Sequence, residues 1–159
     1  MATRKISLRI GLVAALAATV TVVAVGWIGS ASSKAAAQRA AAGATVQTRK
    51  VKKYGVILVN SKGFVLYMFV PDHQKKVTCK GSCAVVWPPL KVKKGQKPTA
   101  GGAARKKLLG TDGRVVTYNR WPLYTYITDT KPGQATGQGI NNSGGKWYVL
   151  SPSGKVIKK

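Results

Sequence analysis

Two aspartates occupy the same place in a repeated motif and are the first candidates for chemistry. Each copy has a tyrosine, a second aromatic residue two positions on, and an aspartate three positions after that; the copies are Tyr67, Phe69 and Asp72, and Tyr124, Tyr126 and Asp129. The chain has only three acidic residues, so this motif holds two of them. Each aspartate stands where a predicted strand enters a turn, where a short carboxylate accepts backbone N–H groups. The alternative is that the two carboxylates meet, and hold a cation or share a proton.

Cys79 and Cys83 are the only cysteines and offer a second kind of chemistry. Residues four apart come within disulfide range if Gly81 tightens the turn between them, and this is the favoured interpretation. Haem attachment is disfavoured because Ala84 stands where a histidine would follow the second cysteine. A metal site would have to use His73, the only histidine, together with further ligands, and it remains the alternative.

A paired nucleophile and base cannot be recognised in the sequence. A Ser-His-Asp arrangement would have to use His73, and no serine lies in a nucleophile elbow. The glycine-rich stretch at residues 99–107 has the composition of a phosphate-binding loop without its spacing, and it predicts a flexible loop. We therefore expect a non-enzymatic protein with no catalytic residue, no bound metal and no cofactor.

Short runs typical of β-strands surround the motif from Tyr54 onward, separated by turns rich in Asn, Asp, Gly and Ser. The two halves align without gaps, with Val59 matched to Val116. The motif strand is apolar on both faces, so each half should cover the apolar face of the other. The sequence predicts an all-β or β-rich domain at residues 54–159, made of two related β repeats at about 54–97 and 108–150 packed together.

The N-terminus predicts a membrane segment. Residues 10–30 carry no charge and follow three basic residues, and about 20 apolar residues suffice to cross a bilayer as a helix. Residues 1–31 are interpreted as an anchor, or as a signal segment if cleaved at the alanines near residue 36. Residues 32–53, rich in alanine and lysine, are interpreted as a tether. The expected location is the cell membrane, with a single span and an extracytoplasmic domain, or the exterior if the segment is removed.

The charge balance indicates an anionic partner. Twenty-seven Lys and Arg against three acidic residues give a formal net charge of +24, far more than solubility requires. The basic residues cluster in predicted loops and at the C-terminus, which favours association with anionic envelope lipid or polymer. Nucleic-acid binding is the alternative, but the aromatic residues fall at alternating positions typical of a core. A redox or metal carrier is a further alternative.

Taken together, these features resemble the secreted bacterial repeat proteins, often called predicted lipoproteins, that carry the Yx(F/W/Y)xxD motif. Both motif copies are present, and the first is followed by "CKGSCAVVWPPL" at residues 79–90. The likeness covers about residues 54–150. It implies an extracytoplasmic protein without a settled biochemical activity. The chain departs from the family in lacking a lipobox cysteine, so lipid anchoring is not implied, and in the very basic stretch at residues 101–110.

Overall fold

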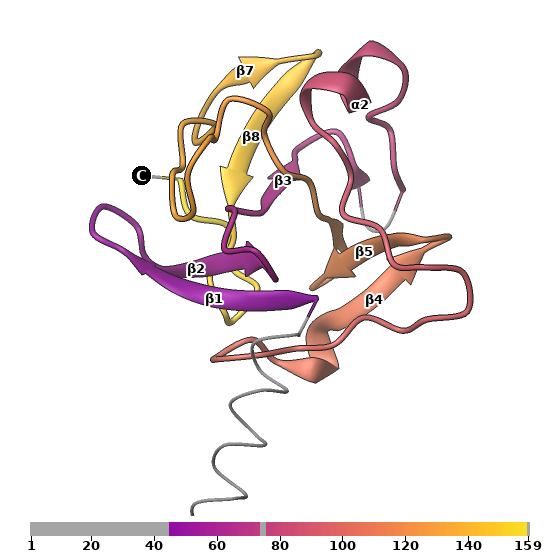
Figure 1. The fold of residues 1–159 in the computed structure, drawn as a ribbon. Coiled ribbons are helices and arrows are strands. Elements are labelled where there is room, and N and C mark those ends of the chain that lie inside the picture. The colour runs from indigo at the N-terminus through magenta and orange to yellow at the C-terminus, as the bar shows by residue number, and fades with distance from the viewer. Residues whose placement is uncertain (1–44, 74–75, 159) are drawn as a thin grey trace, which may run out of the picture.

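A computed structural model describes residues 45–73 and 76–158 of the chain (Figure 1). This part is β-rich, as the sequence predicts. Its strands are β1 (Val46–Val51), β2 (Gly55–Asn60), β3 (Tyr67–Phe69), β4 (Leu109–Asp112), β5 (Val115–Tyr118), β6 (Trp121–Pro122), β7 (Asn141–Asn142) and β8 (Gly145–Val149), and its helical turns are α2 (Ser82–Val86) and η2 (Lys106–Leu108). None of the described helical turns is long and apolar enough to cross a bilayer, and the expected span at residues 10–30 lies outside the described residues.

The first repeat begins with an antiparallel hairpin of β1 and β2. Its pairs run from Val46 opposite Asn60 to Val51 opposite Gly55, and Gly55 has a φ of 75°, which suits the left-handed residue after a three-residue loop. The expected tether at residues 32–53 is therefore wrong for residues 46–51, and the β domain starts before Tyr54. β1 lacks an apolar alternation because Val46 is its only buried residue, whereas Arg49 and Lys50 are exposed.

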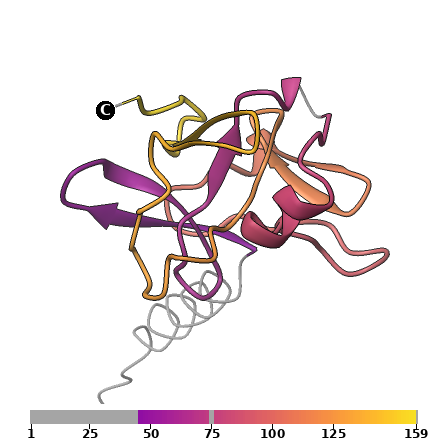
Figure 2. The ribbon, with the colours of Figure 1, turned by 90° about the horizontal axis from the view of Figure 1, so that it is seen from above.

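In the second repeat the β4–β5 hairpin corresponds to β1–β2, and β6 pairs with β5 where Val65 bridges to Val59 in the first repeat. Two-residue turns join β4 to β5 and β5 to β6. The second of these turns consists of Asn119 and Arg120, whose φ angles of 46° and 71° are those of a type I′ hairpin turn. The β1–β2 and β4–β5 hairpins lie on opposite sides of the molecule in both views (Figures 1 and 2).

Each repeat receives a pairing segment from the other. Tyr67 in β3 pairs with Val149 in β8, while Tyr124 bridges to Pro89 of the first repeat. Tyr67 and Tyr124 also pair with each other, because the backbone N–H of each donates to the carbonyl of the other, at 2.8 and 3.0 Å. The repeats are thus intertwined about an approximate two-fold axis that passes between these tyrosines.

Backbone pairing corrects the alignment of the repeats by one residue. The Leu66 N–H donates to the Leu58 carbonyl, and the Leu123 N–H donates to the Val116 carbonyl. Leu58 therefore corresponds to Val116, and Val59 corresponds to Thr117. The physical reason is the type I′ turn of the second repeat, which is one residue shorter than the turn that follows β2.

The two faces of β3 enter two hydrophobic clusters, as its alternation predicts. Tyr67 and Phe69 belong to the first hydrophobic cluster, while Met68 and the preceding Leu66 belong to the second hydrophobic cluster. Both clusters contain residues of both repeats, so neither repeat encloses a core of its own.

The glycine-rich stretch at residues 99–107, expected as a flexible loop, is held along β1. The Val46 N–H donates to the Thr99 carbonyl at 3.0 Å, and the Gly101 N–H donates to the Val46 carbonyl at 2.8 Å. The Ala103 N–H donates to Thr48 Oγ1 at 3.0 Å. This stretch leads into η2 and so fixes the backbone of its lysines beside β4.

Candidate functional site

The tyrosine of each repeat donates a hydrogen bond to the aspartate of the other. The Tyr67 hydroxyl donates to Asp129 Oδ2 at 2.7 Å, and the Tyr124 hydroxyl donates to Asp72 Oδ2. All four residues are buried, with exposed fractions from 0 to 4%. The sequence placed these residues in equivalent positions but did not predict the exchange of partners between repeats.

The second oxygen of each aspartate closes its own turn. Asp72 Oδ1 accepts from the Thr78 N–H at 2.7 Å and from its hydroxyl at 2.5 Å. Asp129 Oδ1 accepts from the Thr136 N–H at 2.9 Å and from its hydroxyl at 2.6 Å. These contacts match the turn role predicted for both aspartates. The hydrogen bonds described at the two carboxylates come from hydroxyl and backbone N–H groups of the protein. This arrangement stabilises the fold.

Burial and the neighbouring carboxylates hold both tyrosines in the neutral form. Burial has the largest effect on the pKa of Tyr67, and the hydrogen bond to Asp129 adds to it, so that this pKa lies well above its usual value of about 10. Burial and then the hydrogen bond to Asp72 raise the pKa of Tyr124 in the same way. Both hydroxyls are therefore hydrogen-bond donors throughout the physiological pH range.

Four aromatic rings stack in a row across the axis. Phe69 stacks on Trp147 with ring centres 4.2 Å apart, Trp147 on Trp87 at 3.9 Å, and Trp87 on Tyr126 at 4.0 Å. The motif tyrosines meet the indoles edge-on, Tyr67 against Trp87 and Tyr124 against Trp147. The second aromatic residue of each motif thus ends the row, and a tryptophan from each repeat fills its middle.

Asn142 holds both indoles of the row. The Trp87 Nε1–H donates to Asn142 Oδ1 at 3.2 Å, and the Trp147 Nε1–H donates to the Asn142 carbonyl at 3.0 Å. The sequence carried a signal for the two tryptophans, because Trp-x-x-Leu occurs at Trp87 and again 60 residues later at Trp147. That spacing differs from the 57 residues between the motifs, so an ungapped comparison missed it.

Cys79 and Cys83 form a disulfide with their Cα atoms 5.3 Å apart, which confirms the favoured interpretation of this pair. Cys79 is buried in the first hydrophobic cluster, and the Trp87 N–H donates to the Cys83 carbonyl at 2.8 Å. The disulfide therefore helps to position Trp87. His73 is exposed, and the described residues contain no group of three or more potential His, Cys, Asp or Glu metal ligands.

The charged residues divide sharply between surface and interior. Every Lys and Arg in the described residues is exposed, whereas Asp72 and Asp129 are buried and Asp112 is half-buried. Asp112 Oδ2 accepts from the Val77 N–H at 3.0 Å, so the third carboxylate also has an internal role. The described surface consequently carries many cations beside a single partly accessible carboxylate.

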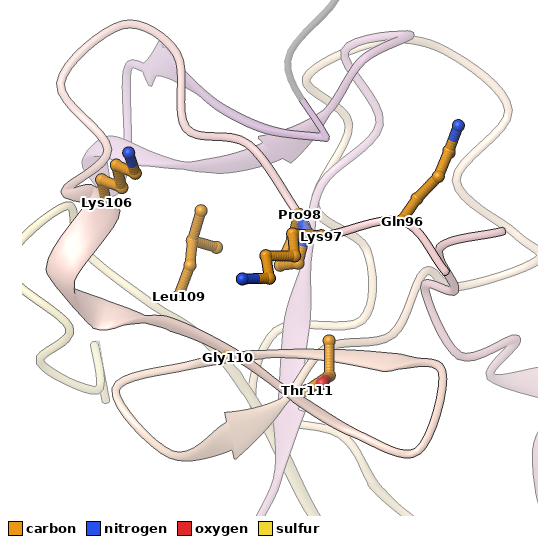
Figure 3. Close-up of a pocket in the computed structure, with 7 residues that line it drawn as sticks. All are labelled: Gln96, Lys97, Pro98, Lys106, Leu109, Gly110 and Thr111. Carbon is orange, nitrogen blue, oxygen red and sulfur yellow. The ribbon is translucent and has the colours of Figure 1, made fainter. Parts of the chain in front are cut away.

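Two lysines border a surface cavity of about 320 Å³ on the second repeat. This lysine cavity lies between residues 96–98 and residues 106–111 (Figure 3). Lys97 extends toward Leu109, Lys106 borders the cavity from η2, and the Gln96 side chain points away from it (Figure 3). The lining contains the apolar Pro98 and Leu109 beside the cationic Lys97 and Lys106, so the cavity can accept an anionic group attached to an apolar or neutral carrier.

Comparison with known families gives a match for both repeats. The matching family model is described as a secreted repeat of unknown function, and it covers residues 48–91 and 109–151. The comparisons with curated proteins and with solved structures gave no match. The first matched segment begins within β1, in agreement with the structural start of the first repeat.

Proposed function

The chain belongs to the secreted repeat family of unknown function, and from this premise we propose that it is a non-enzymatic protein of the cell envelope whose lysine-rich surface binds anionic lipid or wall polymer. A secreted family fits an extracytoplasmic location. Residues 10–30 hold the protein at the membrane in this proposal, or direct its export if they are cleaved.

The separation of charges carries the proposal. Most soluble domains mix both signs on their surface, whereas here the described cations are exposed and two of three carboxylates are buried and hydrogen-bonded. Each basic residue near an anionic membrane surface is worth about 1 kcal/mol, so a surface of this kind binds through many small contributions. Such binding weakens as salt is added, because counterions screen exposed charges.

The position of the aromatic residues favours this proposal over nucleic-acid binding. Proteins that bind single-stranded nucleic acid stack bases on exposed aromatic side chains. Here five aromatic side chains are fully buried, namely Trp87, Trp147, Tyr67, Tyr118 and Tyr124. Within the row of rings, Trp87 already stacks on Tyr126 and on Trp147.

A binding series with the fragment of residues 45–159 tests the proposal. The fragment retains both hydrophobic clusters, and its near-ultraviolet circular dichroism should first be shown to match that of the full chain. We expect it to bind phosphatidylglycerol vesicles or a glycerol phosphate polymer at low salt, and to release them at high salt. Vesicles of phosphatidylcholine and a neutral dextran are the controls. Binding to single-stranded DNA that survives high salt, with vesicles and polymer ignored, would contradict the proposal.

A further inference from the structure

A second, smaller hollow on the second repeat has the features of a discrete anion site. It has a volume of about 130 Å³ and adjoins the lysine cavity, since Leu109 and Gly110 line both. Lys107, Arg120 and Thr117 also line it. A water molecule occupies about 30 Å³ in the liquid, so this Thr117 hollow has room for a small polyatomic ion.

Thr117 contributes a buried hydroxyl that lacks a partner. The residue is 1% exposed, and its Oγ1 is the one buried side-chain oxygen or nitrogen in the described residues without a hydrogen bond. Buried hydroxyls in proteins nearly always have a hydrogen-bond partner, so an unpartnered one calls for a group that the hydroxyl can bind. The neighbours of Thr117 in β5, Val116 and Tyr118, belong to the second hydrophobic cluster, and alternate residues of a strand point to opposite faces, so Thr117 faces away from that cluster.

Gly110 keeps the space beside this hydroxyl open. It lies opposite Thr117 in the β4–β5 pairing, and a Cβ at Gly110 would stand 2.9 Å from Thr117 Oγ1. Any side chain at position 110 would therefore press on the hydroxyl and narrow the hollow.

The first repeat has an apolar residue at the position equivalent to Thr117. Val59 corresponds to Thr117 and lies opposite Gln47, and Val59 is packed in the first hydrophobic cluster. Valine and threonine have nearly the same shape. Where the first repeat has a buried methyl group opposite Gln47, the second repeat has a hydroxyl opposite Gly110. The polar pair occurs in the second repeat, directly after the basic residues 105–107.

Arg120, which lines the hollow, has a backbone conformation that is unfavourable for a residue with a side chain. It is the second central residue of the type I′ turn, with a φ of 71°, where glycine or asparagine is usual. A long side chain in this region is strained, and strain of this kind concentrates at functional sites. Glycine would satisfy the turn better but would remove a cation from the lining of the hollow.

We propose that the Thr117 hollow binds a phosphate group of a linear phosphodiester polymer, an inference that rests on the proposed function and names its ligand. Thr117 Oγ1–H donates to a phosphate oxygen, and Lys107 and Arg120 balance its charge. The lysine cavity, with Lys97 and Lys106, receives the next phosphate along the chain. Adjoining cavities with two cations each suit consecutive charges on one polymer.

Calorimetric titration of the full chain in neutral detergent tests this site. The probes are a short glycerol phosphate oligomer, inorganic phosphate and phosphatidylglycerol in mixed micelles, which separate the polymer, the free ion and the lipid headgroup. The variants are Thr117→Val, which is isosteric, and Arg120→Gly, which relieves the turn. Lys62→Gln is the matched control, because it removes one exposed cation from a turn of the first repeat.

We expect Thr117→Val and Arg120→Gly each to weaken oligomer binding about tenfold, the loss typical of one hydrogen bond to a charged group. Both variants should unfold at the same temperature as the natural chain or higher, since one removes an orphan hydroxyl and the other removes strain. Lys62→Gln should change the affinity less than about twofold, as expected for one screened surface charge.

Three results would overturn the site. Equal losses for Arg120→Gly and Lys62→Gln, with Thr117→Val binding normally, would show that only diffuse charge acts, while leaving the proposed function intact. Tighter binding of the lipid micelles or free phosphate than of the oligomer would exclude the polymer as the occupant. Failure of the natural chain to bind any of the three probes would remove both the site and the proposed function.

Discussion

The hydrogen bonds between Tyr67 and Asp129 and between Tyr124 and Asp72 account for the position of the motif residues. Each aspartate uses one oxygen for the turn of its own repeat and the other for a tyrosine of the partner repeat. A tyrosine and an aspartate are therefore needed together in each repeat, because removing either leaves a buried polar group without its partner.

Tyr67→Phe should lower the free energy of unfolding by about 1.5–3 kcal/mol, the usual value of a hydrogen bond to a charged group. Tyr124→Phe should cost less, because the Tyr67 hydroxyl also accepts from the Gly137 N–H at 3.2 Å. Urea unfolding measures both changes, with the half-buried Tyr148→Phe as the control. A loss no larger than that of the control would show that these bonds are not structural.

Alkaline titration should show two tyrosines that resist ionisation. The pKa values of Tyr67 and Tyr124 are raised in the folded state, so their contribution to stability is complete below the unfolded pKa of about 10 and is lost as pH rises above it. Of the six tyrosines, two should ionise only when the protein unfolds. Absorbance of phenolate against pH measures this, and the double variant Tyr67→Phe, Tyr124→Phe should abolish the late step. Smooth ionisation of all six in the folded protein would contradict it.

The row of rings depends on a glycine in the segment between β6 and β7. A Cβ at Gly137 would lie 2.7 Å from Trp87 Cη2 and 3.1 Å from Tyr126 Cδ1, and Gly137 is not in the left-handed region. The backbone at Gly137 therefore lies against the edge of the Trp87 indole, while Tyr126 and Trp147 stack on its two faces.

Gly137→Ala should cost about 1–3 kcal/mol through overpacking and should reduce the near-ultraviolet circular dichroism of the stacked indoles. Gly139→Ala is the control in the same segment. Its Cβ meets open space but its φ of 74° is unfavourable, so it should lose stability without changing the indole signal. An unchanged spectrum for Gly137→Ala would show that the stack accommodates the methyl group.

Exchange of pairing segments makes the two repeats one folding unit. β8 pairs with β3, Pro89 bridges to Tyr124, and the Leu150 carbonyl accepts from the Leu58 N–H at 3.1 Å. The Leu90 carbonyl accepts from the Val116 N–H at 2.8 Å in the equivalent place. Each half therefore lacks, by itself, both a neighbouring strand and half of each hydrophobic cluster.

Separate fragments of residues 45–104 and 105–159 should each be unfolded and should recover the near-ultraviolet spectrum of the intact domain when mixed. Fragment 45–104 keeps only the β1–β2 hairpin, because the partner of β3 is β8, and a single hairpin is marginal in water. Fragment 105–159 keeps β4 to β8, but it loses the first-repeat half of both hydrophobic clusters. Thermal unfolding of each fragment and of the mixture measures this. A cooperative transition in either fragment alone would show that a repeat is an independent domain.

Alternation, spacing and composition are local properties, so they were enough to predict the β-rich class, the two repeats, the disulfide pair and the excess of cations. The three-dimensional fold was needed to learn which tyrosine donates to which aspartate, which tryptophans stack, and that Thr117 rather than Val116 corresponds to Val59. These features depend on strand exchange and on a turn shortened by one residue, and a one-residue shift moves a side chain to the other face of a strand. Residues 46–51 carry no strand pattern for a related reason: Val46 is the only buried residue of β1, so neither face of the strand needs a row of apolar side chains, and its pairing with β2 is what identifies it as a strand.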